Sequence, residues 1–231
     1  MIQETDFETF LFISKNKYQI FVYDKNNLKN LYNEEIKIND GIELQNLTSF
    51  LEENIYEIEK TINNFIKNII LIIEDEKVLN IGISLKKKNY EEHIDQKNLE
   101  NSLVEAKDVF RENYQDQIIM HMIIVNNDKS ENNFHLNNIN KNDDNLILEV
   151  NFISIPNNFA SYFEKLLGNY QIKIRRYMSG SYIKNFFEED SLELSMVANK
   201  LNYGLNKNEV QLVSKSPENK GFFEKFFQLF S

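Results

Sequence analysis

A run of five consecutive aliphatic residues, Ile-Ile-Leu-Ile-Ile at positions 69–73, constrains the fold of this chain more than any other feature. A strand that is apolar at every position is typical of a sheet covered on both faces. The chain has 231 residues, of which 42% are hydrophobic and 13% aromatic, enough for a substantial core in one large domain or two small ones. We therefore expect a folded protein in which residues 69–73 form a buried strand.

Apolar periodicity divides the rest of the chain into strands and helices. The predicted strands cover residues 10–13, 18–23, 31–38, 69–73, 78–85, 118–125, 146–156, 171–177 and 210–213. The predicted helices cover residues 47–66, 95–113, 157–168 and 178–187, with Asn157 or Asn158 as the N-cap of the third. Residues 192–203 fit a helix or a strand, and we favour the helix. Lys86, Lys87 and Lys88 are expected to leave the sheet as a solvated strand end, the alternative being contact with an anion or a lipid headgroup.

Charge and cysteine content exclude several classes of protein. The net charge is −10, which argues against binding to nucleic acid because phosphate neutralisation needs a basic surface. The chain has no cysteine, so it forms no disulfide, and this composition fits a cytosolic protein. Its first residues are acidic and lack an apolar run, so we expect no signal peptide.

Few residues are suited to catalysis. The three histidines, His93, His121 and His135, do not have metal-ligand spacing, and we expect them to face solvent or to be satisfied in the core. With six glycines in the chain, no phosphate-binding glycine loop is evident. We therefore predict no catalytic residue, no cofactor and no metal site. Arg175 and Arg176, on a predicted strand, could bind a carboxylate of a partner, the alternative being ordinary exposed strand positions.

The last eleven residues, 221–231, predict an amphipathic helix that follows a polar linker at residues 214–220. Its apolar face comprises Phe222, Phe223, Phe226, Phe227, Leu229 and Phe230. A segment this short does not span a bilayer, which takes about 20 apolar residues, but it can lie in the headgroup region. We predict weak, reversible membrane binding, the alternatives being a partner's groove or the protein's own body.

The order of these elements resembles FtsA, the bacterial actin-like cell-division protein that tethers FtsZ filaments to the inner membrane. The similar segments are the opening (residues 10–66, including Asp-Gly-Ile-Glu-Leu at 40–44), an inserted strand–helix–strand–strand module (69–174, with its last long strand at 148–155), the next helix (159–167), the return to the core (172–183, including Ser179-Gly180) and the membrane-targeting helix (222–230). Two features depart from the family. Residues 14–17 read Ser-Lys-Asn-Lys where FtsA has its first phosphate loop, and 231 residues leave no room for the second half of the actin fold.

The resemblance implies an α+β fold: a partial actin-like core with an inserted module and a C-terminal amphipathic helix. The implied divisions are an actin-like opening (1–68), the inserted module and return to the core (69–187), a terminal helix or strand (188–213), a linker (214–220) and the membrane helix (221–231). Because the phosphate loop is replaced, the ATP site of the family is not expected here. The FtsZ-tail site lies in the missing half, so any contact with FtsZ is expected to be indirect.

We therefore expect a non-enzymatic, FtsA-like adaptor in bacterial cell division. It would be cytoplasmic, peripheral on the cytoplasmic face of the inner membrane, and bound to division proteins and to the lipid surface, with self-association strengthening the binding. The alternative is a soluble actin-like adaptor of pilus or secretion assembly that binds a partner's peptide. A third hypothesis is an enzyme that retains nucleotide binding.

Overall fold

The computed structural model describes residues 6–38, 42, 44–88, 96–125, 145–186 and 193–211. The chain forms two compact units. Unit 1 comprises residues 1–78 and 156–203, and unit 2 comprises residues 79–155 and 204–231. Each unit has its own sheet and its own hydrophobic core. The predicted linker and membrane helix, residues 214–231, lie outside the described residues.

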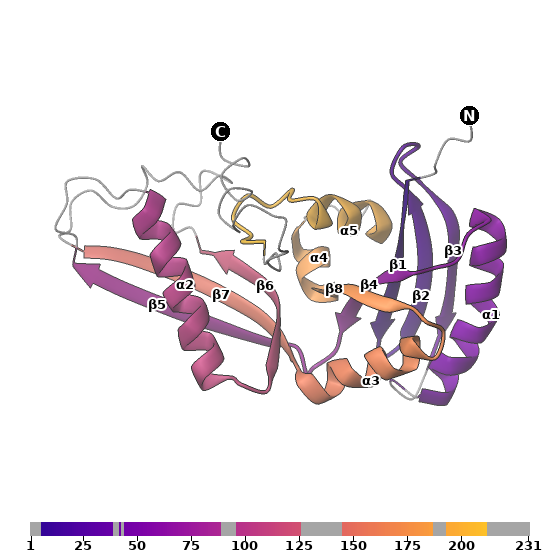
Figure 1. Ribbon diagram of the computed structural model, residues 1–231, viewed down its shortest axis with the longest axis horizontal. Coiled ribbons are helices and arrows are strands. Elements are labelled where there is room, and N and C mark those ends of the chain that lie inside the picture. The colour runs from indigo at the N-terminus through magenta and orange to yellow at the C-terminus, as the bar shows by residue number, and fades with distance from the viewer. Residues whose placement is uncertain are drawn as a thin grey trace. The chain divides into compact units, whose positions relative to one another are not determined.

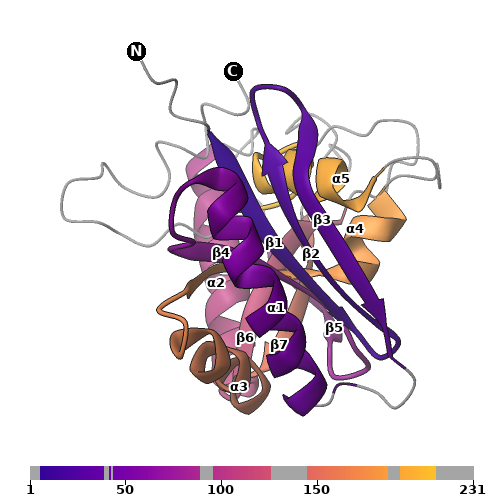
Figure 2. The ribbon, with the colours of Figure 1, turned by 90° about the vertical axis from the view of Figure 1, so that its right-hand side faces the viewer.

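Unit 1 is built on a five-stranded mixed sheet in the order β3-β2-β1-β4-β8 (Figures 1 and 2). Its strands are β1 (Phe7–Ser14), β2 (Lys17–Asp24), β3 (Lys29–Lys37), β4 (Asn68–Glu74) and β8 (Lys173–Ser179). The first three strands form an antiparallel meander, whereas β4 runs parallel to β1, and β8 runs parallel to β4. The parallel strands β1, β4 and β8 therefore end at the same edge of the sheet.

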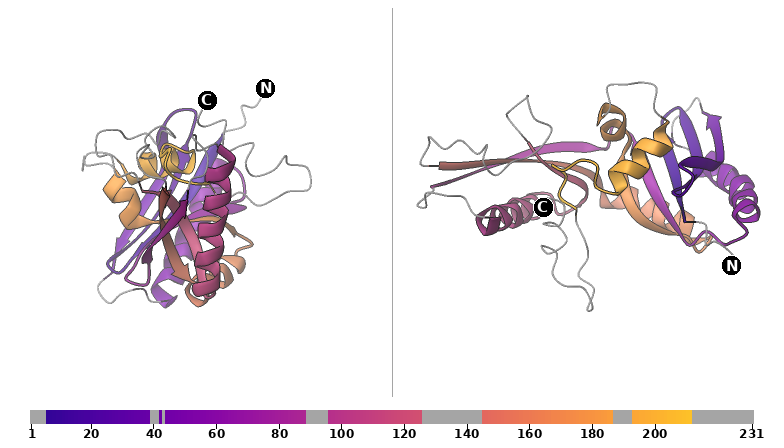
Figure 3. Two further views of the ribbon diagram at one scale, coloured as in Figure 1. Left: turned by 90° about the vertical axis from the view of Figure 1, so that its left-hand side faces the viewer. Right: turned by 90° about the horizontal axis from the view of Figure 1, so that it is seen from above.

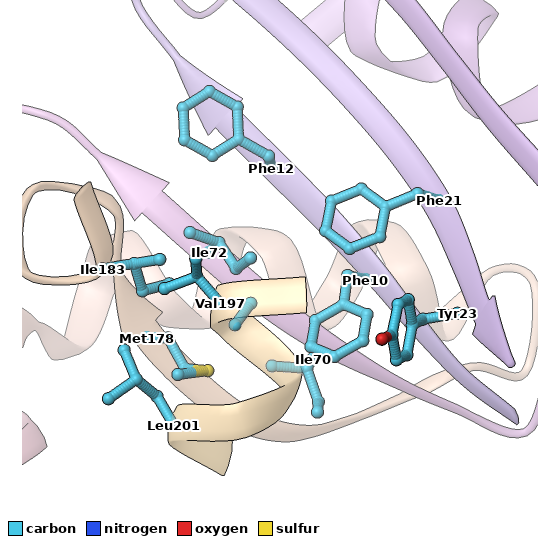
Figure 4. Packing of buried hydrophobic residues seen from close by; sticks show 11 residues of the cluster. Phe10, Phe12, Phe21, Tyr23, Ile70, Ile72, Met178, Ile183, Val197 and Leu201 are labelled. Carbon is cyan, nitrogen blue, oxygen red and sulfur yellow. The ribbon is translucent and has the colours of Figure 1, made fainter. Parts of the chain in front are cut away.

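Helices cover both faces of this sheet. Figure 2 shows α1 (Leu44–Ile62) and α3 (Asn157–Gly168) on one face, with α4 (Gly180–Phe186) and α5 (Leu194–Asn202) on the other. Each residue from Ile69 to Ile73 is at most 1% exposed, which confirms the strand predicted to be covered on both faces. The α4–α5 face of the core is drawn in Figure 4, where Phe10, Ile70 and Met178 of three neighbouring strands pack towards Val197 and Leu201 of α5.

Unit 2 contains a three-stranded sheet in the order β5-β7-β6 and one long helix. Its elements are β5 (Leu79–Lys88), α2 (Gln96–Asn113), β6 (Gln117–Ile124) and β7 (Asn145–Pro156). The helix α2 covers one face of this sheet, as Figure 1 and the right-hand view of Figure 3 show. Leu103, Ala106 and Phe110 of α2 pack against Val150 and Phe152 of β7 to form the core of the unit.

The chain returns to unit 2 after α5 and lies along the free edge of β6. Ile124 donates its backbone N–H to Asn208 O at 2.9 Å, and Val210 donates to Met122 O at 2.8 Å. Of the strand predicted at residues 210–213, residues 212 and 213 lie outside the described residues. Among the described residues the pairing at this edge is one bridge, Ile123↔Glu209. Successive residues of an extended chain point to opposite faces of a sheet. Val210, next to Glu209, therefore points to the face under α2 and is part of the core there.

Three local predictions were wrong. The helix predicted to reach residue 66 ends at Ile62, since Asn63 takes a positive φ of 51° that breaks the helix, and Phe65 is left 75% exposed. Pro156, and neither Asn157 nor Asn158, occupies the N-cap position of α3, because its φ of −61° and ψ of 138° keep it extended. Residues 86–88 do not leave the sheet, because they pair with residues 145–147 of β7, the last pair being Lys88↔Asn145. The favoured helix at residues 192–203 is confirmed as α5.

Candidate functional site

The carboxyl ends of the parallel strands in unit 1 are the first candidate site. In open sheets of this kind, ligands bind beyond the carboxyl ends of parallel strands. Ser14 at the end of β1 pairs with Glu74 at the end of β4, and Ile73 pairs with Ser179 at the end of β8. The β1–β2 turn and the start of α4 therefore border the same place.

The β1–β2 turn, residues Ser14 to Lys17, directs its polar groups to its own chain. The Ser14 hydroxyl donates to Asn16 Oδ1 at 2.8 Å. Lys15 Nζ lies 2.7 Å from Glu76 Oε2, and this hydrogen bond and the opposite charge raise the pKa of Lys15 and lower that of Glu76. Lys17 Nζ lies 3.1 Å from Glu35 Oε2. Both ammonium groups of the turn are therefore paired within the protein.

The space beside this turn is filled by side chains. A Cβ added to Gly180, at the start of α4, would lie 2.8 Å from Glu74 Cβ and 3.1 Å from the Phe12 ring. Lys184 forms an ion pair with Glu74, and its Nζ lies 5.2 Å from the centroid of the Phe12 ring. Gly180 is thus required for close packing between α4 and the ends of β1 and β4.

These residues do not fit the phosphates of a nucleotide. A phosphate-binding turn presents free backbone N–H groups, usually through glycine, to the anion. Here the β1–β2 turn contains no glycine, Gly180 is packed against Glu74 and Phe12, and the Glu74 carboxylate would repel a phosphate. Among the described residues, no group of three or more His, Asp or Glu side chains is placed to hold a metal ion.

The opposite end of β1 carries an ionic network around the buried residue Glu8. Arg175 of β8 donates through NH1 to Glu8 Oε1 at 3.0 Å, and its NH2 forms an ion pair with Glu8 Oε2, also at 3.0 Å. Tyr203, at the end of α5, donates its hydroxyl to Glu8 Oε1 at 2.8 Å. Lys25 contacts Asp6 and donates to the Tyr203 hydroxyl at 3.1 Å. Burial alone would lower the pKa of Lys25, but these hydrogen bonds and the Glu8 charge outweigh it and raise the pKa.

The two arginines predicted as partner contacts are thus placed in unit 1, where both bind their own chain. Arg176 donates through NH1 to Asn202 O at 3.3 Å, next to the end of α5. The Arg175 side chain remains 44% exposed, so its contact with a partner stays a prediction. The six apolar side chains of the predicted membrane helix, residues 222–230, lie outside the described residues, and their role also stays a prediction. Sequence analysis missed Glu8 and Tyr203; the one local signal was an acidic residue, Glu8, at the start of an apolar strand.

Sequence analysis also missed a buried pair in unit 2. His121 Nδ1 lies 2.7 Å from Glu209 Oε1, with the two side chains 0% and 3% exposed. His121 is thus satisfied in the core, one of the two environments expected for the histidines, and the pair fastens the segment that contains Glu209 to β6. His93 and His135 lie outside the described residues. Among the described residues, no helix is long and apolar enough to cross a membrane.

Comparison with known proteins identifies the class of the fold. No protein-family model and no curated protein sequence matches the chain. A chain of the PilM–PilN type IV pilus biogenesis complex matches it with a TM-score of 0.50 and 12% identity, over 78% of this chain and 49% of that one. The chain has part of the actin-like fold. It spans about half the length of that chain of the pilus complex.

Two further structures are similar at lower scores. One is a Bacteroides thetaiotaomicron protein of unknown function with an actin-like ATPase fold, at a TM-score of 0.35 and 15% identity over 80% of this chain and 58% of that one. The other is the cytoplasmic domain of EpsL, an inner-membrane component of the type II secretion system of Vibrio cholerae, at a TM-score of 0.36 and 8% identity over 75% of this chain and 56% of that one. The predicted α+β, partial actin-like fold is confirmed, and the resemblance to FtsA holds at the level of this fold.

Proposed function

We propose that this chain is a non-enzymatic adaptor, built on part of the actin-like fold, that binds a protein partner during assembly of a pilus or a secretion system. The observation that carries the proposal is the filled end of the parallel strands in unit 1, where Phe12, Glu74 and Gly180 pack together. Without room for a phosphate there, the fold would act through its surfaces, by contacts with other proteins. The similarity to a chain of a pilus biogenesis complex supports this role.

Calorimetry with the full chain tests the non-enzymatic part of the proposal. Titration with ATP and Mg²⁺ is expected to give only the heat of dilution, because the Lys15, Lys17 and Lys184 ammonium groups already have carboxylate partners. Saturable binding of ATP would overturn the proposal and would favour the hypothesis of a nucleotide-binding enzyme.

In this proposal the adaptor acts in the cytoplasm, on the inner face of the inner membrane, where the predicted helix at residues 221–231 holds it weakly to lipid. The test is flotation of the full chain with vesicles that contain anionic lipid. The double variant Phe226→Glu, Phe227→Glu is expected to stay at the bottom of the gradient. A matched control, Gln228→Glu with Ser231→Glu, adds the same charge to the polar side and is expected to float. Undiminished flotation of the Phe226→Glu, Phe227→Glu protein would remove the helix from the proposal.

A second candidate is the FtsA-like division adaptor, and one observation favours it. The apolar helix predicted at residues 222–230 is similar to the membrane-targeting helix of FtsA. A fluorescent fusion in dividing cells separates the two candidates. Bands at mid-cell would favour division, whereas polar or dispersed foci would favour pilus or secretion assembly.

A further inference from the structure

Among the described residues, nothing pairs with the outer edge of β5. The order β5-β7-β6 makes β5 and β6 the two edge strands of the sheet. The chain itself covers the edge of β6 through the backbone hydrogen bonds of Asn208 and Val210. In the described part of the chain, no strand pairs with the outer edge of β5.

The strand β5 has the geometry that strand addition needs. It is ten residues long, and its register with β7 runs from Leu79↔Ser154 to Lys88↔Asn145 without a shift. Edge strands are usually protected from pairing by being short, by bulges, by proline or by charged side chains. In β5 the only such device is the lysine run at its end.

The pairing with β7 shows which backbone groups of β5 are free. Val125 donates its N–H to Glu149 O at 2.9 Å, so the polar backbone groups of Glu149 point away from β5 and towards β6. Backbone groups alternate between the two edges of a strand, so Leu148 and Val150 point to β5. Their partners are Leu85 and Ile83.

It follows that the residues between those partners, Gly82, Ser84 and Lys86, direct their N–H and C=O groups to the open edge. The side chains of Ser84 and Lys86 are exposed, on the face of the sheet opposite α2. Both the free backbone groups and the exposed face are therefore available to a second strand.

Gly82, in the middle of β5, is not needed for close packing among the described residues. A Cβ added there would have no atom within 4 Å, and its φ is not in the left-handed region. Glycine inside a strand is destabilising relative to alanine, and it often marks a place where another backbone approaches closely. Room for an added chain is a physical reason for glycine at this position.

The charge at the end of β5 points to the chemistry of the partner. Residues 86–88 are three consecutive lysines in a chain of net charge −10. The Lys86 side chain is exposed, and no carboxylate among the described residues pairs with it. We propose that an extended, acidic segment of a partner protein adds to the open edge of β5 and that its carboxylates pair with the lysines. The proposal rests on the adaptor role for the existence of such a partner.

A synthetic strand tests the edge directly. The probe is a fluorescein-labelled peptide of about ten residues, matched to the length of β5, in which Glu and Val alternate, and its partner control alternates Lys and Val. Fluorescence anisotropy with the full chain is expected to show binding of the Glu–Val peptide and binding at least about tenfold weaker for the Lys–Val peptide.

The variant Ser84→Pro removes a free N–H from the edge without removing a hydrogen bond to β7. It is expected to weaken binding of the Glu–Val peptide by about fivefold to tenfold, the loss of affinity expected when one backbone hydrogen bond to the peptide is not formed. The matched control, Ser84→Thr, keeps the N–H and is expected to bind as the wild type does. If Ser84→Pro loses the circular dichroism of the folded protein, the triple variant Lys86→Glu, Lys87→Glu, Lys88→Glu replaces it and is expected to reverse the preference towards the Lys–Val peptide.

Three results would overturn the proposal: no binding of the Glu–Val peptide, equal binding of both peptides, or equal binding to the wild type and Ser84→Pro. A dimer of the wild type that Ser84→Pro converts to a monomer in sedimentation would also overturn it, since a second copy would then occupy the edge. The adaptor role fails separately. Saturable ATP binding together with specific peptide binding would overturn the non-enzymatic role and leave the edge site standing.

Discussion

Units 1 and 2 differ in how much of their sheets they leave open. In unit 1 helices cover both faces of the sheet. Glu8 at the start of β1 is paired with Arg175, and Glu74 at the end of β4 is paired with Lys184. In unit 2 one helix covers one face, and the other face exposes Asn80, Ser84 and Lys86 of β5. Within the described residues, unit 1 therefore satisfies its charged groups internally, whereas unit 2 leaves polar side chains of β5 exposed.

The first way to test this comparison is to destabilise unit 2 alone. Phe110 is fully buried, and its ring centroid lies 4.7 Å from that of Phe152. Phe110→Ala is expected to cost about 3–5 kcal/mol of the free energy of unfolding of unit 2, because it leaves a cavity under α2. Hydrogen exchange should quicken in β5, β6 and β7 and stay slow in β1 and β4. Val104→Ala in the same helix, 42% exposed, is the control and should cost about 0.5 kcal/mol or less. Equal acceleration in both units would contradict the division into two.

The second test concerns the buried pair that fastens residues 208–210 to β6. Glu209→Ala is expected to cost about 3 kcal/mol, since it leaves His121 buried without this partner. Protection of the Val210 and Ile124 amides from hydrogen exchange should fall most. Lys207→Ala, in the same turn and exposed, serves as the control. Unchanged protection of both amides in Glu209→Ala would show that the backbone bonds alone hold this segment.

The third test uses one glycine from each unit. Gly180→Ala is expected to lower the free energy of unfolding by about 1–3 kcal/mol, because its Cβ would overlap Glu74 and Phe12. Gly82→Ala is expected to raise it by about 0.5–1 kcal/mol, because its Cβ meets open space in a strand. Urea denaturation of both variants measures the difference. A loss of stability in Gly82→Ala would mean that β5 is more closely covered than its open edge implies.

The smallest expected effect is a pH dependence in unit 1. Hydrogen bonds from the Asn27 side chain and from the backbone N–H groups of Asn27 and Asn26 to the Asp24 carboxylate lower the pKa of Asp24. The lowered pKa stabilises the fold above the ordinary carboxyl pKa of about 4, and this contribution is lost as the pH falls below it. The stability of Asp24→Asn should therefore change less between pH 6 and pH 3 than that of the wild type, as measured by urea denaturation. An identical pH profile for both proteins would show that the turn contributes nothing to acid sensitivity.

Local periodicity was enough to predict most strands and helices. The apolar run at residues 69–73 predicted a buried strand, and the spacing of Leu99, Leu103 and Phe110 predicted the inner face of a helix. Both predictions are confirmed. Where prediction failed, a neighbouring strand or a local backbone conformation decided the outcome. Residues 86–88 stay in the sheet because β7 continues opposite them, and the helix α1 ends early because Asn63 takes a left-handed conformation.

The candidate site was harder to predict because its contacts are far apart in the sequence. Glu8 and Arg175 are separated by 167 positions, and Glu74 and Lys184 by 110. No spacing rule connects such residues; the pairing of β4 with β1 and β8 brings them together. The absence of glycine from residues 14–17 was visible in the sequence, whereas the tight packing of Gly180 against Glu74 required the fold.

The seam between residues 208–210 and β6 has a mechanical consequence. Among the described residues, this seam is the last part of the chain, so tension that reaches it from the carboxyl side acts first on two backbone hydrogen bonds and on the anchorage of Val210. Only after these yield would the force reach α5 and the Glu8 network. If the predicted terminal helix is fixed to a surface, the sheet whose edge we propose for a partner would be strained by a pull before the other described parts of the chain.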